Sequence, residues 1–178
     1  MNLTEKTLES KILFEGRILR LRRDVVALPN GREAFREVVD HPGGVCVLAL
    51  DGENRALLVR QFRYPYLAEL REIPAGKLEY GEDPDQAALR ELREETGAVP
   101  GEFRSLGELY PSAGYCGEVI RMYLAQDLRF GETSPDEDEF LAVERVDFHE
   151  LVEQVLSGEI KDAKTIAAVL KAKLLLER

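Results

Sequence analysis

Three glutamates, Glu91, Glu94 and Glu95, crowd the short stretch RELREETG at residues 90–97. On an α-helix, side chains three and four residues apart are neighbours, so these carboxylates would share one face and repel one another. A helix face that lies in water tolerates such a cluster, and that is the plainer interpretation. Hard divalent cations, however, bind clustered carboxylate oxygens. The spacing therefore indicates either a solvated helix face or a cation site.

The glutamates need a helix to hold them, and the flanking residues predict one over residues 84–96. Asp83 is suited to the N-cap, Pro84 to the first helical position and Gly97 to the C-terminal end. Gln86, three residues after Asp83, makes a capping-box-like pair. The side chains expected to pack inward are Ala88, Leu89, Leu92 and Thr96.

The loop before this helix, EIPAGKLEYGEDP at residues 72–84, contains the residues of a compact turn. Gly76 and Gly81 permit tight or positive-φ backbone, and proline fixes the approach. Such a loop can aim backbone carbonyls and the Glu82 side chain at the acidic helix face. Arg90 lies one turn before Glu94 and can pair with it.

From Gly76 through Glu82 and Arg90 to Ala98, the stretch resembles the Nudix box at every defined position. The resemblance implies an α/β protein with a Nudix-type α/β/α sandwich and a mixed sheet, to which this chain adds an N-terminal β segment. It also implies hydrolysis of a nucleoside diphosphate linked to another moiety, with Mg²⁺ as cofactor and Mn²⁺ as the alternative.

The resemblance assigns roles to individual residues. Glu91 and Glu95 would be the principal metal ligands and catalytic carboxylates, Glu94 would assist them, and the carbonyl of Ala75 would complete the metal shell. Arg90 would orient the glutamates. Bound cations neutralise crowded phosphate oxygens and acidify the attacking water. They would also let a protein with a net charge of −10 bind an anionic substrate.

Further stretches resemble the ADP-ribose pyrophosphatase branch of the family, so the leading reaction is conversion of ADP-ribose to AMP and ribose 5-phosphate. Ala113 stands where relatives that prefer ADP-ribose often carry a second proline, so another nucleotide sugar such as GDP-mannose is an alternative. A non-catalytic nucleotide-binding module is a second alternative, although the chain keeps every box glutamate. The stretches are VDHPGGVCVLAL (39–50), LLVRQFRYP (57–65), EIPAGKLE (72–79), DEDEFLAV (136–143) and SGEIKDAKT (157–165).

Substrate contacts are also implied by the branch. Arg63 would bind a substrate phosphate, with the capping of a strand end as the equally weighted alternative. Arg36 and Glu118 are further expected substrate-binding residues. Because the chain has no tryptophan, adenine stacking would have to come from another aromatic or arginine side chain, and the candidates are Phe14 and Phe35.

The general base is expected on a mobile loop, SPDEDEFLAV at residues 134–143. Glu139 is the first choice and Glu137 the second, because the apolar strand that starts at Phe140 would anchor Glu139 against the core. A solvated loop tip is the usual fate of such an acidic run.

The rest of the chain divides into residues 1–40, expected to form N-terminal strands, and residues 41–178, expected to form the hydrolase domain. Strands are predicted near 18–28, 32–39, 43–50, 55–62, 103–110, 119–126 and 140–147, and helices near 148–156 and 163–176. The resemblance implies a homodimer in which N-terminal strands, within residues 11–39, exchange between subunits and help to build the partner's substrate site.

Composition limits the partners and the location. The chain has 178 residues, is 44% hydrophobic and 33% charged, and its net charge of −10 argues against nucleic-acid and anionic-membrane binding. No apolar run approaches the ~20 residues of a membrane span, and no signal sequence is evident, which predicts a cytoplasmic protein. Cys46 lies in an apolar run and is expected to be a buried, reduced thiol.

Overall fold

The computed structural model describes residues 2–79, 81–134 and 140–177. The chain forms two compact units. The N-terminal unit comprises residues 1–43 and 110–119, and the core unit comprises residues 44–109 and 120–178.

The N-terminal unit is built on an antiparallel sheet in the order β1-β2-β3, with strands Lys6–Glu15, Arg20–Ala27 and Glu33–Asp40. The chain turns between β2 and β3, which correspond to the strands predicted near 18–28 and 32–39: Gly31 has a φ of 80° and its amide donates to the Leu28 carbonyl at 2.9 Å. Every residue of β1 is exposed. This first strand extends further toward the N-terminus than the strand pattern predicted.

The core unit contains a four-stranded sheet in the order β7-β4-β9-β8, which is mixed because β4 and β9 run parallel while the other pairs are antiparallel. A second, antiparallel sheet has the order β10-β5-β6. A short 3-10 helix, Tyr64–Tyr66, follows β5. The strands are β4 Gly44–Ala49, β5 Arg55–Arg63, β6 Ala68–Glu72, β7 Ala75–Lys77, β8 Ala98–Leu109, β9 Ile120–Phe130 and β10 Leu141–Asp147.

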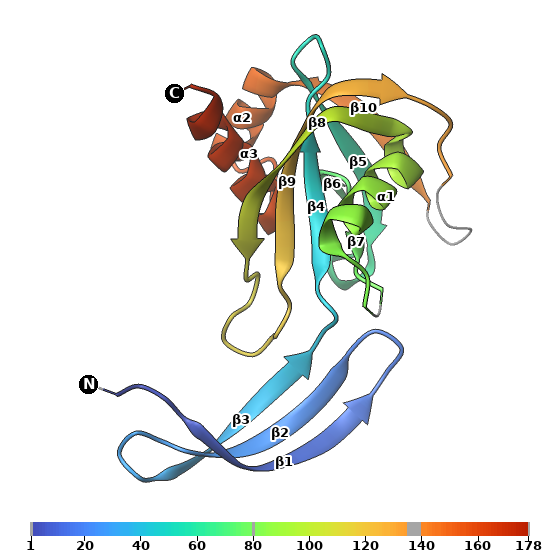
Figure 1. The fold of residues 1–178 in the computed structure, drawn as a ribbon. Helices are drawn as coiled ribbons and strands as arrows, with labels where there is room; N and C mark the ends of the chain where they lie inside the picture. The colour runs from blue at the N-terminus through green and yellow to red at the C-terminus, as the bar shows by residue number, and fades with distance from the viewer. Residues whose placement is uncertain (1, 80, 135–139, 178) are drawn as a thin grey trace. The chain divides into compact units, whose positions relative to one another are not determined.

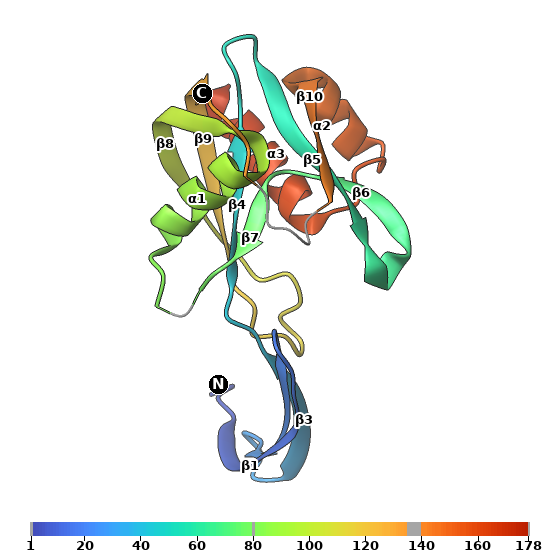
Figure 2. The ribbon, with the colours of Figure 1, turned by 90° about the vertical axis from the view of Figure 1, so that its right-hand side faces the viewer.

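Helices cover both sides of this core (Figures 1 and 2). Helix α1, Pro84–Thr96, packs on one face of the four-stranded sheet and α3, Ala163–Leu176, on the other, while α2, Phe148–Leu156, packs beside α3 against β10 and β5. The apolar strand β4 serves both faces, because Cys46 faces the α2–α3 side and Val47 the α1 side. The predicted α/β/α sandwich with a mixed sheet is therefore confirmed.

Some predicted bounds differ from the structure. Strand β8 begins at Ala98, well before residue 103, and β9 continues to Phe130. Strands β6 and β7 were not predicted, because they are short and Pro74 lies between them; pairing with β5 and β4 defines them. The buried thiol of Cys46 is confirmed, and its burial raises the pKa to about 12.

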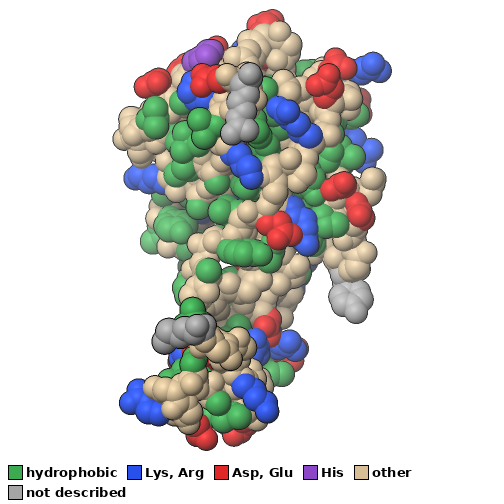
Figure 3. Space-filling model, turned by 60° about the vertical axis from the view of Figure 1, so that its left-hand side comes forward, with side chains coloured by type: hydrophobic (Ala, Val, Ile, Leu, Met, Phe, Trp, Pro, Cys, Tyr) green, Lys and Arg blue, Asp and Glu red, His purple; other side chains and the backbone are tan. Residues whose placement is uncertain are grey.

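None of the described helices is long and apolar enough to span a membrane. On the face drawn in Figure 3, basic side chains are interspersed with acidic and apolar ones.

Candidate active site

Helix α1 is fixed at both ends, as its sequence predicts. Asp83 accepts hydrogen bonds from the backbone amides of Asp85 and Gln86 at 3.0 and 3.1 Å. Gly97 adopts the left-handed conformation with a φ of 71°, and its amide donates to the Arg93 carbonyl at 2.8 Å. The Tyr123 hydroxyl on β9 donates to Asp85 at 2.7 Å. These contacts set the rotation of α1 and hence the direction of its glutamates.

Arg90 organises the acidic face of α1. Its Nη1 donates to Glu91 at 2.9 Å and to Glu94 at 3.0 Å, and its Nε and Nη2 donate to Glu82 at 2.9 and 3.1 Å. The predicted pair between Arg90 and Glu94 is thus present. The hydrogen bonds with Glu82 and the charges of Glu91 and Glu94 raise the pKa of Arg90 despite its partial burial. The same bonds lower the pKa of Glu82.

Two box glutamates lie directly against strand β7. The Ala75 amide donates to Glu95 at 3.1 Å, and Glu95 is only 3% exposed. A Cβ at Gly76 would lie 1.9 Å from the carboxylate carbon of Glu91. Real Cβ atoms never approach so closely, so only glycine allows Glu91 this position. The box glycine and the box glutamate are therefore one packing unit.

The oxygen atoms of this group suit a hard divalent cation. Glu91, Glu94 and Glu95 project from one helix, and the Ala75 backbone meets Glu95. Within residues 2–79, 81–134 and 140–177, no three acidic, histidine or cysteine side chains converge as a ready-made metal site. Arg90 holds Glu91 and Glu94, so binding a cation would require these carboxylates to be shared between Arg90 and the metal. The ligand assignments remain predictions.

Arg63, at the end of β5, forms a two-pronged ion pair with Glu72. Its Nε and Nη2 each donate to the Glu72 carboxylate at 2.7 Å. Lys164 also contacts this carboxylate, which is 2% exposed. Burial alone would raise the pKa of Glu72, but the two cations lower it to about 2. The Arg63 side chain is still 38% exposed, so an anionic ligand can reach it.

Arg36 and Glu118 belong to the N-terminal unit. Arg36 donates through Nε to Glu5 at 2.9 Å, and Glu118 lies 3.5 Å from His41 Nδ1. Phe35, a candidate for adenine stacking, is exposed and has the Arg23 guanidinium 5.1 Å from its ring centroid. These substrate-binding roles stay predictions.

The expected general base, Glu139, and its alternative, Glu137, lie outside the described residues. The strand that follows them begins at Leu141, which pairs with Gln61 of β5. Phe140 is 85% exposed, and β10 is held by backbone pairing with β5. The assignment of Glu139 as the base stays a prediction.

Four residues that the sequence reasoning left without a role form a cluster beside the box: Glu72, Asp162, Lys164 and Thr165. All four occur in stretches noted only for their resemblance to the branch. The feature that could have drawn attention to them is the occurrence of the charged residues Glu72, Asp162 and Lys164 in otherwise apolar or helical sequence. Burial of such charges demands partners, but the sequence does not say which partners.

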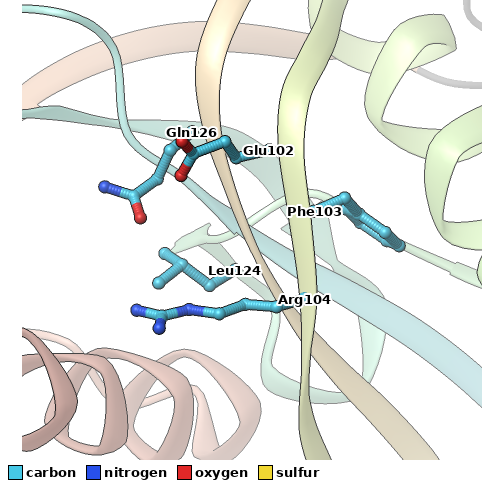
Figure 4. A pocket seen from close by; sticks show the side chains of 5 residues that line it. All are labelled: Glu102, Phe103, Arg104, Leu124 and Gln126. Atoms are coloured by element: carbon cyan, nitrogen blue, oxygen red, sulfur yellow. The ribbon is translucent and has the colours of Figure 1, made fainter.

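A hollow of about 340 Å³ lies on β8 and β9, away from these residues. Figure 4 shows Phe103 on the opposite side of β8 from the other four side chains. The hollow contains none of the predicted site residues. It offers one carboxylate, so it lacks the clustered acids that pyrophosphate chemistry requires. Its lining residues are Glu102, Phe103, Arg104, Leu124 and Gln126.

Comparison with known proteins agrees with this geometry. Residues 40–169 match the NUDIX domain, and residues 5–39 match the nucleoside diphosphate sugar hydrolase N-terminal domain. A crystal structure of an ADP compounds hydrolase superposes with a TM-score of 0.86 at 20% identity, covering 99% of this chain and 97% of that one, which supports the fold.

Relatives of similar length carry three different names. An ADP-ribose pyrophosphatase of Bacillus subtilis is 42% identical over 170 residues, 94% of this chain and 92% of the relative. A methanol dehydrogenase activator of Bacillus methanolicus is also 42% identical, over 93% of this chain and 90% of the relative. A GDP-mannose pyrophosphatase of Shigella flexneri is 33% identical over 74% of this chain and 73% of the relative.

Proposed function

The chain belongs to the NUDIX domain family, and we propose that it is a Nudix pyrophosphohydrolase that converts ADP-ribose and water to AMP and ribose 5-phosphate. The observation that carries this proposal is the packing of Glu91 and Glu95 against the Gly76–Ala75 backbone. That packing gathers hard oxygen donors on one side of a capped helix. Similarity over nearly the full length to an ADP-ribose pyrophosphatase supports the choice of substrate.

Family membership makes a divalent metal the expected cofactor, and Mg²⁺ is the metal we propose, with Mn²⁺ as a substitute. Glu91, Glu94, Glu95 and the Ala75 carbonyl would hold it. When bound, the metal neutralises charge on the diphosphate oxygens and makes an attacking water more acidic. Arg90 keeps the carboxylates on one side of α1, so that their mutual repulsion does not splay them.

Other residues of the chain would bind substrate and move the proton. Arg63 would place its guanidinium on a phosphate, with Arg36 and Glu118 as further substrate contacts. Glu139 would accept the proton of the attacking water, with Glu137 as the alternative base. A positioned base contributes roughly 10²–10⁴-fold. Turnover of Glu139→Gln should fall by this factor with little change in substrate affinity, and the loss should be smaller in Glu137→Gln; the reverse order would transfer the role to Glu137.

The N-terminal strands, residues 1–40, would form the interface of a homodimer. Strand β1 is exposed along its whole length and includes Leu8, Ile12 and Phe14, which are 49%, 51% and 57% exposed. A sheet this open is a marginal structure alone and gains from burial against a second copy. Sedimentation should show a dimer at micromolar concentration, which Ile12→Asp should weaken. A monomeric wild type would refute this part of the proposal.

The remaining partners follow from charge. The net charge of −10 favours a small anionic substrate held through cations over nucleic acid, and we propose that the enzyme acts in the cytoplasm.

The deciding experiment is an assay of nucleoside diphosphate compounds with Mg²⁺, with products identified by chromatography. AMP and ribose 5-phosphate from ADP-ribose, at a kcat/KM well above that for GDP-mannose, is the expected result. A preference for GDP-mannose would move the substrate to the alternative that the Shigella relative and Ala113 favour. Tight nucleotide binding with no product would instead identify a non-catalytic module.

A further inference from the structure

Glu72 is a buried carboxylate at the end of β6, just upstream of the box. It is 2% exposed and receives two hydrogen bonds from Arg63 at 2.7 Å each. Lys164, on the first turn of α3, also contacts it and donates to Asp162 at 2.9 Å. The Lys164 side chain is only 11% exposed. Two cations and two carboxylates balance each other here, which is the condition under which charges can be buried.

The same cluster holds the backbone beside Glu72. Asp162 caps α3 by accepting from the Thr165 amide at 2.9 Å and from the Thr165 hydroxyl at 2.6 Å. The Thr165 hydroxyl oxygen in turn accepts a hydrogen bond from the Ile73 amide at 3.0 Å. Consecutive residues, Glu72 by its side chain and Ile73 by its backbone, are therefore tied to the start of α3.

The chain then runs directly to the box glutamates. The Pro74 carbonyl accepts from Val47 of β4 at 2.9 Å, and the Ala75 amide donates to Glu95 at 3.1 Å. Gly76 lies against Glu91 so closely that no Cβ fits between them. From Glu72 to Gly76 every residue has a fixed contact, so this segment has little slack.

The cluster also lies within electrostatic reach of the box. The hydrogen bonds to Glu72, together with the charges of Asp162 and Glu95, raise the pKa of Arg63. Arg63 thus connects the buried cluster electrostatically with Glu95, which is proposed to bind the metal. Glu72 orients the Arg63 guanidinium through two hydrogen bonds.

We propose that Lys164 is a positioning residue for the hydrolysis: with Arg63 it clamps Glu72, and this clamp sets Ala75 and Gly76 against Glu95 and Glu91. The proposal rests on the proposed function. Removing the Lys164 charge leaves the cluster with an excess of buried negative charge, and the segment from Glu72 to Gly76 must shift to relieve it. A shift of roughly 1 Å near reacting groups costs on the order of 10²-fold in rate.

The test compares Lys164→Met with Lys171→Met, which removes an exposed lysine from the same helix. Turnover and KM for ADP-ribose are measured at saturating Mg²⁺, and Mn²⁺ binding is followed by the electron paramagnetic resonance signal of free Mn²⁺. For Lys164→Met we expect kcat to fall by about 10–100-fold and Mn²⁺ affinity to fall by about tenfold, with KM much less affected. Lys171→Met should match the wild type, and Lys164→Arg should recover part of the loss.

A purely structural role predicts a different result. If Lys164→Met melts at a lower temperature yet keeps a kcat and a Mn²⁺ affinity within about twofold of Lys171→Met, the proposal is overturned. If Lys164→Met does not fold, the double variant Glu72→Gln, Lys164→Met is measured, since it restores the charge balance of Arg63 and Asp162. Because this variant has lost the Lys164–Glu72 contact that ties the segment to α3, its kcat and Mn²⁺ affinity should still lie below those of Lys171→Met, and wild-type values would overturn the clamp. A wild type that releases no AMP would defeat the proposed function instead, while the Mn²⁺ comparison would still test the clamp.

Discussion

Two ionic clusters lie on either side of strand β7, and they are balanced differently. Around Arg90, three carboxylates (Glu82, Glu91 and Glu94) meet one guanidinium, and Glu95 projects from the same helix. Around Glu72, two carboxylates meet two cations. The second cluster is neutral, with Glu72 and Lys164 nearly closed to water and Arg63 38% exposed, whereas the first carries a net negative charge and is partly exposed.

The difference indicates what each cluster is for. A neutral buried cluster holds the chain in place, because every charge already has its partner. A cluster with more carboxylates than cations attracts further positive charge, and a divalent cation has the matching ligand chemistry. The two clusters meet through the segment from Glu72 to Gly76, so the neutral one can position the charged one.

The largest effect is expected when one box carboxylate of α1 is neutralised. Glu91→Gln and Glu95→Gln keep the size of the side chain but remove the charge that attracts the cation. Turnover at saturating Mg²⁺ should fall by about 10²–10³-fold, because a proposed ligand of the cation that neutralises the diphosphate loses its charge. Circular dichroism should be unchanged. Near-normal turnover in either variant would sink the metal assignment.

Gly76→Ala tests the packing of Glu91 without changing any charge. The added Cβ would lie 1.9 Å from the Glu91 carboxylate, so that side chain must move. We expect turnover to fall by about 10–100-fold, whereas the free energy of unfolding should change little, because the clash is with the free end of a flexible side chain. Gly52→Ala is the control, since nothing lies within 4 Å of its Cβ. Equal activity of the two variants would show that the Glu91 position is not critical.

The neutral cluster has its own signature in the pH dependence of stability. Arg63 and Lys164 lower the pKa of Glu72 from 4.5 to about 2 despite its burial. The stabilisation from Glu72 is therefore complete above pH 4.5 and is lost as pH falls toward 2. It corresponds to about 3 kcal/mol. Urea titrations between these pH values should show a steeper loss for wild type than for Glu72→Gln. An equal loss of stability with falling pH in the two proteins would contradict the lowered pKa of Glu72.

The smallest effect is expected for an exposed ion pair outside both clusters. Lys173 donates to Glu177 at 2.7 Å at the end of α3, and Glu177 is 57% exposed. Such pairs contribute about 0–1 kcal/mol, so Lys173→Met should change stability by less than this and leave turnover unchanged. A tenfold loss of turnover would show that removing any positive charge from α3 affects the site. An effect of Lys164→Met could then not be attributed to its contact with Glu72.

The cluster around Arg90 could be predicted from the sequence because its residues are close together in the chain. Asp83, Gly97 and the four-residue spacing of Arg90 and Glu94 all follow from helix geometry. The alternation of β4 between two faces likewise follows from an unbroken apolar run. These elements depend on residues that are neighbours in the chain.

The cluster around Glu72 could not be predicted from the sequence, because tertiary packing brings its residues together. Lys164 and Glu72 are 92 positions apart, and the local pair between Lys164 and Asp162 does not indicate that Glu72 is a further partner. The burial of Glu95 and the short strands β6 and β7 also depend on what packs against them. Hydrophobic patterns and secondary-structure propensities describe one helix or strand at a time, so they do not predict contacts between elements.

We propose that the box carboxylates of α1 bind the cation on which hydrolysis depends. The most direct test is the rate of AMP release from ADP-ribose as a function of free Mg²⁺, for wild type and Glu91→Gln. Wild type stripped with EDTA should be inactive and should recover fully with Mg²⁺, and Glu91→Gln should need at least about tenfold more Mg²⁺ and reach a lower plateau. AMP release that persists in EDTA, or identical Mg²⁺ curves for the two proteins, would contradict the account.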